Sequence, residues 1–142
     1  MKKIYVASSL NKIDTGFKGR LFKKLSEIAN DVFFPDYIDP TAFSGDEMTY
    51  VDKICSREIR ACDIFIAIYP FGLSVATEIG RFLESHINQC NSEKLLVILD
   101  ISEAHSLEYN KLRSEAMIIP HISRIVYSED ELLSLLGNFL QT

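Results

Sequence analysis

The stretch that decides the fold is DIFIAIYP, residues 63–70, in which six apolar residues stand between Asp63 and Pro70. An apolar run of this length without polar alternation is typical of a central parallel strand that is buried on both faces. To either side, shorter apolar runs alternate with segments of helical periodicity. The predicted strands are Ile4–Ser8, Val32–Phe34, Ile64–Tyr69, Leu95–Leu99 and Ile125–Tyr127, and the predicted helices are Phe17–Asn30, Asp46–Cys62, Ser74–Asn88, Leu107–Ala116 and Glu129–Leu140.

This alternation predicts an α/β fold in one domain that spans residues 1–142. We expect a single doubly wound, five-stranded parallel sheet of flavodoxin- or Rossmann-like type, in the order 2-1-3-4-5, with helices on both faces. Ligands of such sheets bind beyond the carboxyl ends of the strands where the order reverses, here between the first and third strands. The segments of interest are therefore Ala7–Leu10 and Tyr69–Ser74.

The composition narrows the class of partner. The formal net charge of -5 argues against a nucleic-acid polymer, because phosphate backbones are bound by basic patches. Three cysteines without a C-x-x-C pair favour reduced thiols in a cytoplasmic protein. His86 and Cys90 share a helical spacing but have no further ligand nearby, so we expect no metal and no cofactor. No stretch reaches the length of a membrane span.

Glu78 is the candidate catalytic group. If Ser74 is the N-cap of its helix, a capping box would need the acid at position 77, which is Thr77, so capping does not explain Glu78. The nearby helix N-terminus favours an ionised carboxylate, which suits a nucleophile or a stabiliser of an oxocarbenium-like transition state. The alternative is a solvated glutamate that complements the helix dipole, and the spacing alone favours that alternative.

Three stretches together resemble the nucleoside 2-deoxyribosyltransferase family: KIYVAS at 3–8, DIFIAIYP at 63–70 and TEIGRFLES at 77–85. The resemblance covers about the first two-thirds of the chain. It implies that Glu78 is the nucleophile that attacks the anomeric carbon and that Tyr5 orients it. It also implies a small-molecule nucleoside or nucleotide as substrate and a homo-oligomer, a dimer or larger, in which a neighbour completes the pocket.

One departure from the family pattern concerns the loop before Glu78. Deoxyribose-transferring members usually carry D-x-G-[TS]-x-x-E, whose aspartate would protonate the leaving base; here Gly72 stands at the aspartate position and Ser74 replaces the glycine. The chain in this respect resembles the hydrolase branch, the 2'-deoxynucleoside 5'-phosphate N-hydrolases. Gly72 and Ser74 would then hold a phosphate with the amides of the helix start, and Ser8 and Ser9 a phosphate or sugar hydroxyl, with loop capping as the alternative for the serines.

Several other side chains are candidates for a role at the site. Tyr69 and Phe71 are candidates for stacking on a base, although Tyr69 equally fits the last buried position of its strand. Asp63 is interpreted as structural. An acid in or after the long loop would replace the missing proton donor, although a solvated acidic loop is favoured; these acids are Asp36, Asp39, Asp46 and Asp52.

Two other functions stay open. Gly45-Asp46 and the glutamate on the helix after a strand also resemble TIR domains, which cleave the nicotinamide N-glycosidic bond of NAD, although the chain lacks tryptophan. The missing aspartate alternatively indicates a silent, nucleotide-sensing module. The sequence therefore predicts an enzyme that cleaves an N-glycosidic bond, as a hydrolase or a base-exchange transferase, with these two alternatives beside it.

Overall fold

The apolar runs form one five-stranded parallel sheet in the order β2-β1-β3-β4-β5, as the sequence predicts. The computed structural model describes residues 2–9, 12–38, 47–88, 94–103 and 122–140. The direction of winding reverses between β1 and β3, which are neighbours in the sheet. The strands are β1 (Lys3–Ala7), β2 (Asp31–Phe33), β3 (Ile64–Tyr69), β4 (Leu95–Asp100) and β5 (Arg124–Val126).

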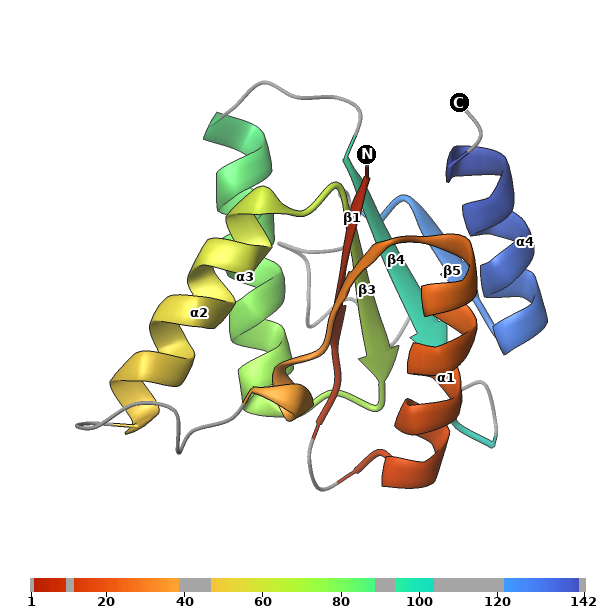
Figure 1. Cartoon of the computed structure of the whole chain (residues 1–142), viewed down its shortest axis with the longest axis horizontal. Helices are drawn as coiled ribbons and strands as arrows, with labels where there is room; N and C mark the ends of the chain where they lie inside the picture. The colour runs from red at the N-terminus through yellow and green to blue at the C-terminus, as the bar shows by residue number, and fades with distance from the viewer. Residues whose placement is uncertain (1, 10–11, 39–46, 89–93, 104–121, 141–142) are drawn as a thin grey trace.

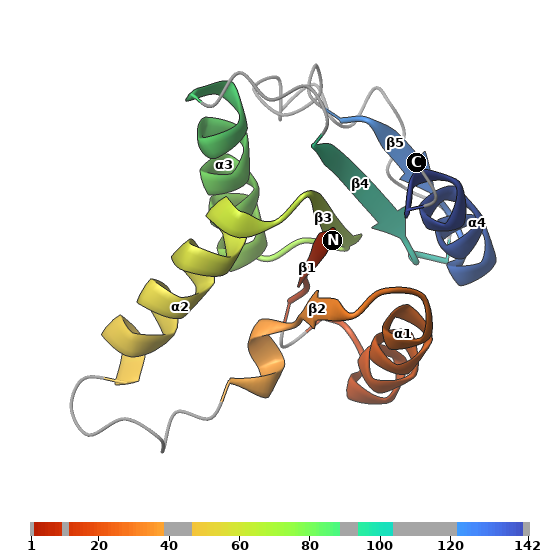
Figure 2. The same cartoon turned by 45° about the horizontal axis from the view of Figure 1, so that its top comes forward.

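The helices form a layer on each face of the sheet. In Figures 1 and 2, α2 and α3 lie on one side of the strands, and α1 and α4 lie on the other. Within the described ranges, no helix combines the length and apolar character that a bilayer crossing requires. The helices are α1 (Thr15–Ile28), α2 (Glu47–Ala61), α3 (Leu73–Asn88) and α4 (Glu129–Leu140), and a 3-10 turn, η1, covers Pro35–Tyr37.

The alternation of side chains along the strands divides the core in two. Tyr5 and Phe65 belong to the cluster on the α2/α3 face, together with Val75 and Ile79 of α3. The neighbouring strand positions, such as Ile4, belong to the second cluster on the α1/α4 face. A side chain of β1 therefore faces α3 only if it lies on the same side of the sheet as Tyr5, at every second position along the strand.

The starts of α1 and α3 differ from the prediction, while the residue predicted to start α2, Asp46, lies outside the described residues. α1 begins at Thr15 rather than Phe17, because the Asp14 side chain accepts a hydrogen bond from the Phe17 amide at 3.0 Å and caps the helix. α3 begins at Leu73, and the Gly72 carbonyl accepts from the Ala76 amide at 3.2 Å, so Gly72 takes the cap position. The predicted helix Leu107–Ala116 lies outside the described residues.

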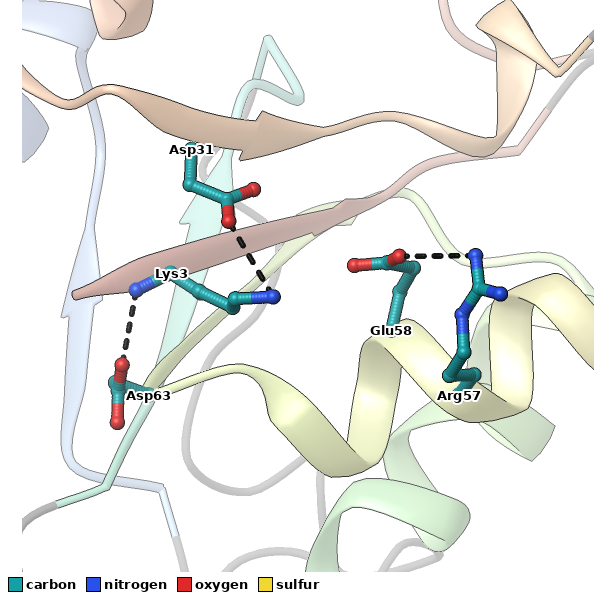
Figure 3. A network of polar contacts seen from close by, with 5 residues as sticks. All are labelled: Lys3, Asp31, Arg57, Glu58 and Asp63. Carbon is teal, nitrogen blue, oxygen red and sulfur yellow. Dashed lines mark hydrogen bonds and ion pairs between the residues drawn. The ribbon is translucent and has the colours of Figure 1, made fainter. Parts of the chain in front are cut away.

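The amino edge of the sheet carries a network of polar contacts (Figure 3). Asp63 accepts a hydrogen bond from the Lys3 amide through its side chain and donates one to the Lys3 carbonyl through its own amide, both at 2.9 Å. The Lys3 ammonium lies 3.4 Å from a carboxylate oxygen of Asp31 on β2. Asp63 thus joins the starts of β1 and β3, at the opposite edge from the loops that follow these strands.

Candidate active site

A hydrogen bond joins Tyr5 and Glu78, the two residues that the sequence puts forward as catalytic. Tyr5 stands in the middle of β1 with a fully buried side chain, and its ring stacks on Phe33 at 5.3 Å and on Phe65 at 5.2 Å between centroids. The packed ring leaves little freedom to the hydroxyl, which donates a hydrogen bond to Oε2 of Glu78 on α3. The carboxylate of a half-buried residue is thereby tied to a fully buried side chain at the centre of the sheet.

Burial dominates the electrostatics of Glu78. Desolvation raises the pKa of its carboxyl above the usual value, the Tyr5 hydrogen bond and the Arg81 charge lower it, and the Asp36 charge raises it. The sequence indicated instead that the helix N-terminus would favour the ionised form. Because α3 is capped by Gly72, Glu78 lies beyond the first helical turn, where the dipole effect has fallen off.

The hydroxyl of Tyr5 is held in its protonated form. Burial, and after it the negative charge of Glu78, raises the tyrosine pKa far above its usual value. The thiol of Cys55 on α2 adjoins the same hydroxyl, and burial raises the pKa of that thiol. The Tyr5 hydroxyl therefore keeps its proton and can always donate a hydrogen bond to Glu78. Cys55 carries no local motif, so the sequence pattern did not single it out for this site.

The loops after β1 and β3 meet at the switch point. A Cβ at Gly72 would lie 3.3 Å from the Ser9 side-chain oxygen, which is tighter than an ordinary contact. Ser8 and Ser9 are both buried, with 9% and 7% of their surface exposed, and within the described part of the chain the Ser8 hydroxyl has no hydrogen-bond partner. This close approach gives a physical reason for a glycine at position 72.

The remaining predicted residues line the loop after β3. Tyr69 and Phe71 are partly buried against the α2/α3 core and contact each other edge to face, with centroids 5.2 Å apart. The Lys12 ammonium, which the sequence did not single out, donates to the Phe71 carbonyl at 3.0 Å. The prediction of Ser74 as the N-cap is wrong; it lies exposed in the first turn of α3.

Asp36 is not a solvated loop residue. Its carboxylate lies 2.8 Å from the ammonium of Lys18 on α1, and the two side chains are only 14% and 2% exposed. Asp52, by contrast, is exposed, and it lies 2.7 Å from Arg81. Asp39 and Asp46 fall outside the described residues. Lys18 was missed because a single lysine on the inner side of an amphipathic helix has no recognisable pattern.

An apolar cavity of about 360 Å³ lies on the other side of Phe33 from Tyr5. It lies along the edge strand β2, and Phe33, which stacks on the Tyr5 ring, is part of its wall. Five aromatic rings give it the character of a site for a flat ligand. Its walls are formed by Phe22, Val32, Phe33, Phe34, Tyr37, Ile38, Tyr50, Ile54 and Arg57.

No metal centre is found among the residues that the structure describes, since no three His, Cys, Asp or Glu side chains gather there. Cys90, the partner considered for His86, lies outside them. The chemistry available at the described site is that of a carboxylate, a tyrosine hydroxyl, a thiol and loop hydroxyls.

Comparison with known proteins places the fold. No family model matches the chain, and no curated protein does. A conserved protein from Enterococcus faecalis V583, known from its crystal structure, is similar in structure with a TM-score of 0.64 at 20% identity, over 94% of this chain and 96% of that one. A 2-desoxiribosyltransferase from Leishmania mexicana is similar with a TM-score of 0.49 at 22% identity, over 72% of this chain and 66% of that one. At such identities, the Enterococcus likeness shows a shared fold.

Proposed function

We propose that this protein cleaves the N-glycosidic bond of a nucleoside or nucleotide, with Glu78 as the nucleophile. The observation that carries the proposal is the hydrogen bond from the buried Tyr5 hydroxyl to Glu78 Oε2. A carboxylate whose orientation is set by a donor on a central strand is prepared to attack an electrophilic carbon from one direction. The E-I-G element at Glu78 and its resemblance to the deoxyribosyltransferases give that carbon the identity of C1'.

The reaction proceeds in two displacements. Glu78 attacks C1' as the C1'–N bond breaks, the bonding electron pair leaves with the base, and the base takes up a proton from the solvent, which the second step returns. The product of this step is an ester between the sugar and Glu78, formed through an oxocarbenium-like transition state. Water then attacks C1', frees the carboxylate of Glu78 and gives up one proton, so that the sum of the steps adds one water across the bond. Tyr5 keeps its hydrogen bond to the carboxylate in both steps.

Hydrolysis is favoured over base exchange by the loop after β3. Gly72 stands where the transferases carry the aspartate that serves the leaving base, and a side chain there would lie tightly against Ser9. Ser8, Ser9, Gly72 and Ser74 are proposed to hold a 5'-phosphate or the sugar hydroxyls. The base is proposed to lie against Tyr69 and Phe71. We further propose a cytoplasmic homo-oligomer, following the family.

The test is direct detection of free base. The protein is incubated with deoxynucleosides, with their monophosphates and with NAD, and released bases are separated by chromatography. Release that is lost in Glu78→Gln and kept in Glu27→Gln, an exposed glutamate of α1, supports the proposal. Release from NAD alone favours the TIR-like alternative, tight nucleotide binding without turnover favours the sensing module, and base exchange with an added nucleobase shows a transferase.

A further inference from the structure

Arg81 links α3 to α2 one helical turn beyond Glu78. Residues three apart on a helix are neighbours on its surface, so the side chains of Arg81 and Glu78 leave α3 next to each other. Arg81 Nη1 lies 2.7 Å from Asp52 Oδ1 and 3.0 Å from the Ser56 hydroxyl, both on α2. The guanidinium therefore lies on the same helix as the carboxylate at the proposed reaction centre and is paired with a carboxylate on the neighbouring helix.

The groups that face Glu78 come from four elements. Tyr5 on β1 donates a hydrogen bond to it, and Cys55 on α2 adjoins that hydroxyl. Among the charges that act on Glu78 in the described part of the chain, Asp36 of η1 is negative and Arg81 of α3 is positive. Asp52 of α2, with a side chain that is 55% exposed, is the ion-pair partner of Arg81.

We propose that Arg81 is a positioning residue whose positive charge keeps Glu78 in its anionic form, and that Asp52 weakens this effect by neutralising part of that charge in its ion pair with Arg81. The inference rests on the proposed function, because a nucleophilic carboxylate has to be ionised. Burial disfavours the charged form of the Glu78 carboxyl, and the positive charge of Arg81 favours it. Ser56 holds the guanidinium on the α2 side without adding a charge.

The two partners of this one ion pair therefore act on Glu78 in opposite directions. Removing Arg81 takes away an attractive charge and raises the Glu78 pKa further. Removing the charge of Asp52 leaves the positive charge of Arg81 without its ion-pair partner and lowers that pKa. An ion pair that only fastened α2 to α3 would be broken equally from either side, and both variants would then move Glu78 in the same direction or not at all.

The experiment follows the titration of Glu78 itself. The full chain is labelled with glutamate enriched in ¹³C at the carboxyl, and the Glu78 signal is identified by its loss in Glu78→Gln. We expect the titration midpoint to move up in Arg81→Met and down in Asp52→Asn, and to stay near the wild-type value in Arg81→Lys, which keeps the charge. Lys24→Met breaks the Lys24–Glu129 ion pair between α1 and α4, far from Glu78, and should leave the midpoint in place.

Shifts of equal sign in Arg81→Met and Asp52→Asn, or no shift in both, overturn the inference. Because Asp52 is more than half exposed, Asp52→Asn keeps the fold and decides the question if Arg81→Met does not fold. The acid limb of base release against pH should follow the two midpoints. Opposite shifts without any base release would uphold the control of Glu78 by Arg81 and refute the proposed function.

Discussion

The Tyr5 hydroxyl donates a hydrogen bond to Glu78 Oε2, and these residues are 73 positions apart in the sequence. Tyr5 belongs to the centre of the sheet and is fully buried, whereas Glu78 belongs to a helix and is half-buried. The contact therefore joins the buried centre of the sheet to a partly exposed carboxylate on a helix. The contribution of this hydrogen bond can be measured by substituting either residue.

Glu78→Gln should stabilise the protein at neutral pH. Burial raises the folded-state pKa of Glu78 above its unfolded value, so its contribution to stability is fully present below the unfolded pKa, about 4.3, and is lost as the pH rises through the folded pKa. Glutamine cannot ionise and escapes this loss. Calorimetry from pH 4 to 8 should show a Tm advantage of the variant that shrinks in acid; a Tm deficit that is constant across this range contradicts it.

Tyr5→Phe should slow base release with little loss of fold. A hydrogen bond to a charged group contributes about 1.5–3 kcal/mol, so kcat should fall by about 10- to 100-fold. The phenylalanine ring keeps its stacking on Phe33 and Phe65. Because the lost hydrogen bond lowered the Glu78 pKa, the acid limb of the pH profile should move to higher pH. An unchanged kcat with a shifted KM would place Tyr5 in substrate binding instead.

Gly72→Ala should perturb the loop through Ser9. The new Cβ would lie 3.3 Å from the Ser9 oxygen and 3.6 Å from its Cβ, so only the oxygen is crowded. We expect a destabilisation of about 1 kcal/mol and a raised KM, since overpacking costs about 1–3 kcal/mol. In the double variant Ser9→Ala, Gly72→Ala, the remaining contact is an ordinary one. A double-mutant cycle by urea denaturation should therefore show coupling, and strict additivity would exclude the contact.

Asp36→Asn should have opposite effects on stability and on Glu78. It leaves the Lys18 ammonium, which is 2% exposed, without its carboxylate, and breaking such a buried pair costs about 3 kcal/mol. It also removes a charge that raises the Glu78 pKa, so the acid limb of base release should move to lower pH. Urea denaturation and a pH profile measure the two effects. Replacing both partners, Lys18→Met with Asp36→Leu, should restore most of the stability.

The sheet was predictable because its strands are apolar runs, and right-handed crossovers leave few orders for five of them. β3 and α4 have the predicted bounds, while β1, β2 and β5 each start one residue early. The start of α3 was wrong because a serine is a better cap than a glycine in general, whereas here the Gly72 carbonyl accepts the first hydrogen bond of the helix, from Ala76.

The charges around Glu78 could not be predicted in the same way. The pairs Lys18–Asp36 and Arg81–Asp52 each join two elements whose relative placement depends on the packed sheet. Cys55 and Phe33 meet Tyr5 only because α2 and β2 pack beside β1. Local patterns report which face of an element is buried, and they carry no information on which side chain stands opposite.

The anchor at the amino edge of the sheet has a consequence for alignment. Asp63 binds both the amide and the carbonyl of Lys3, and so fixes β1 against β3 at one end. A displacement of β1 by a single residue would send the Tyr5 hydroxyl through the sheet to the opposite layer, and Ile4 or Val6 would face α3 instead. Asp63 thereby selects the side of the sheet on which Tyr5 meets Glu78, although it lies at the other end of the strands from the proposed reaction centre.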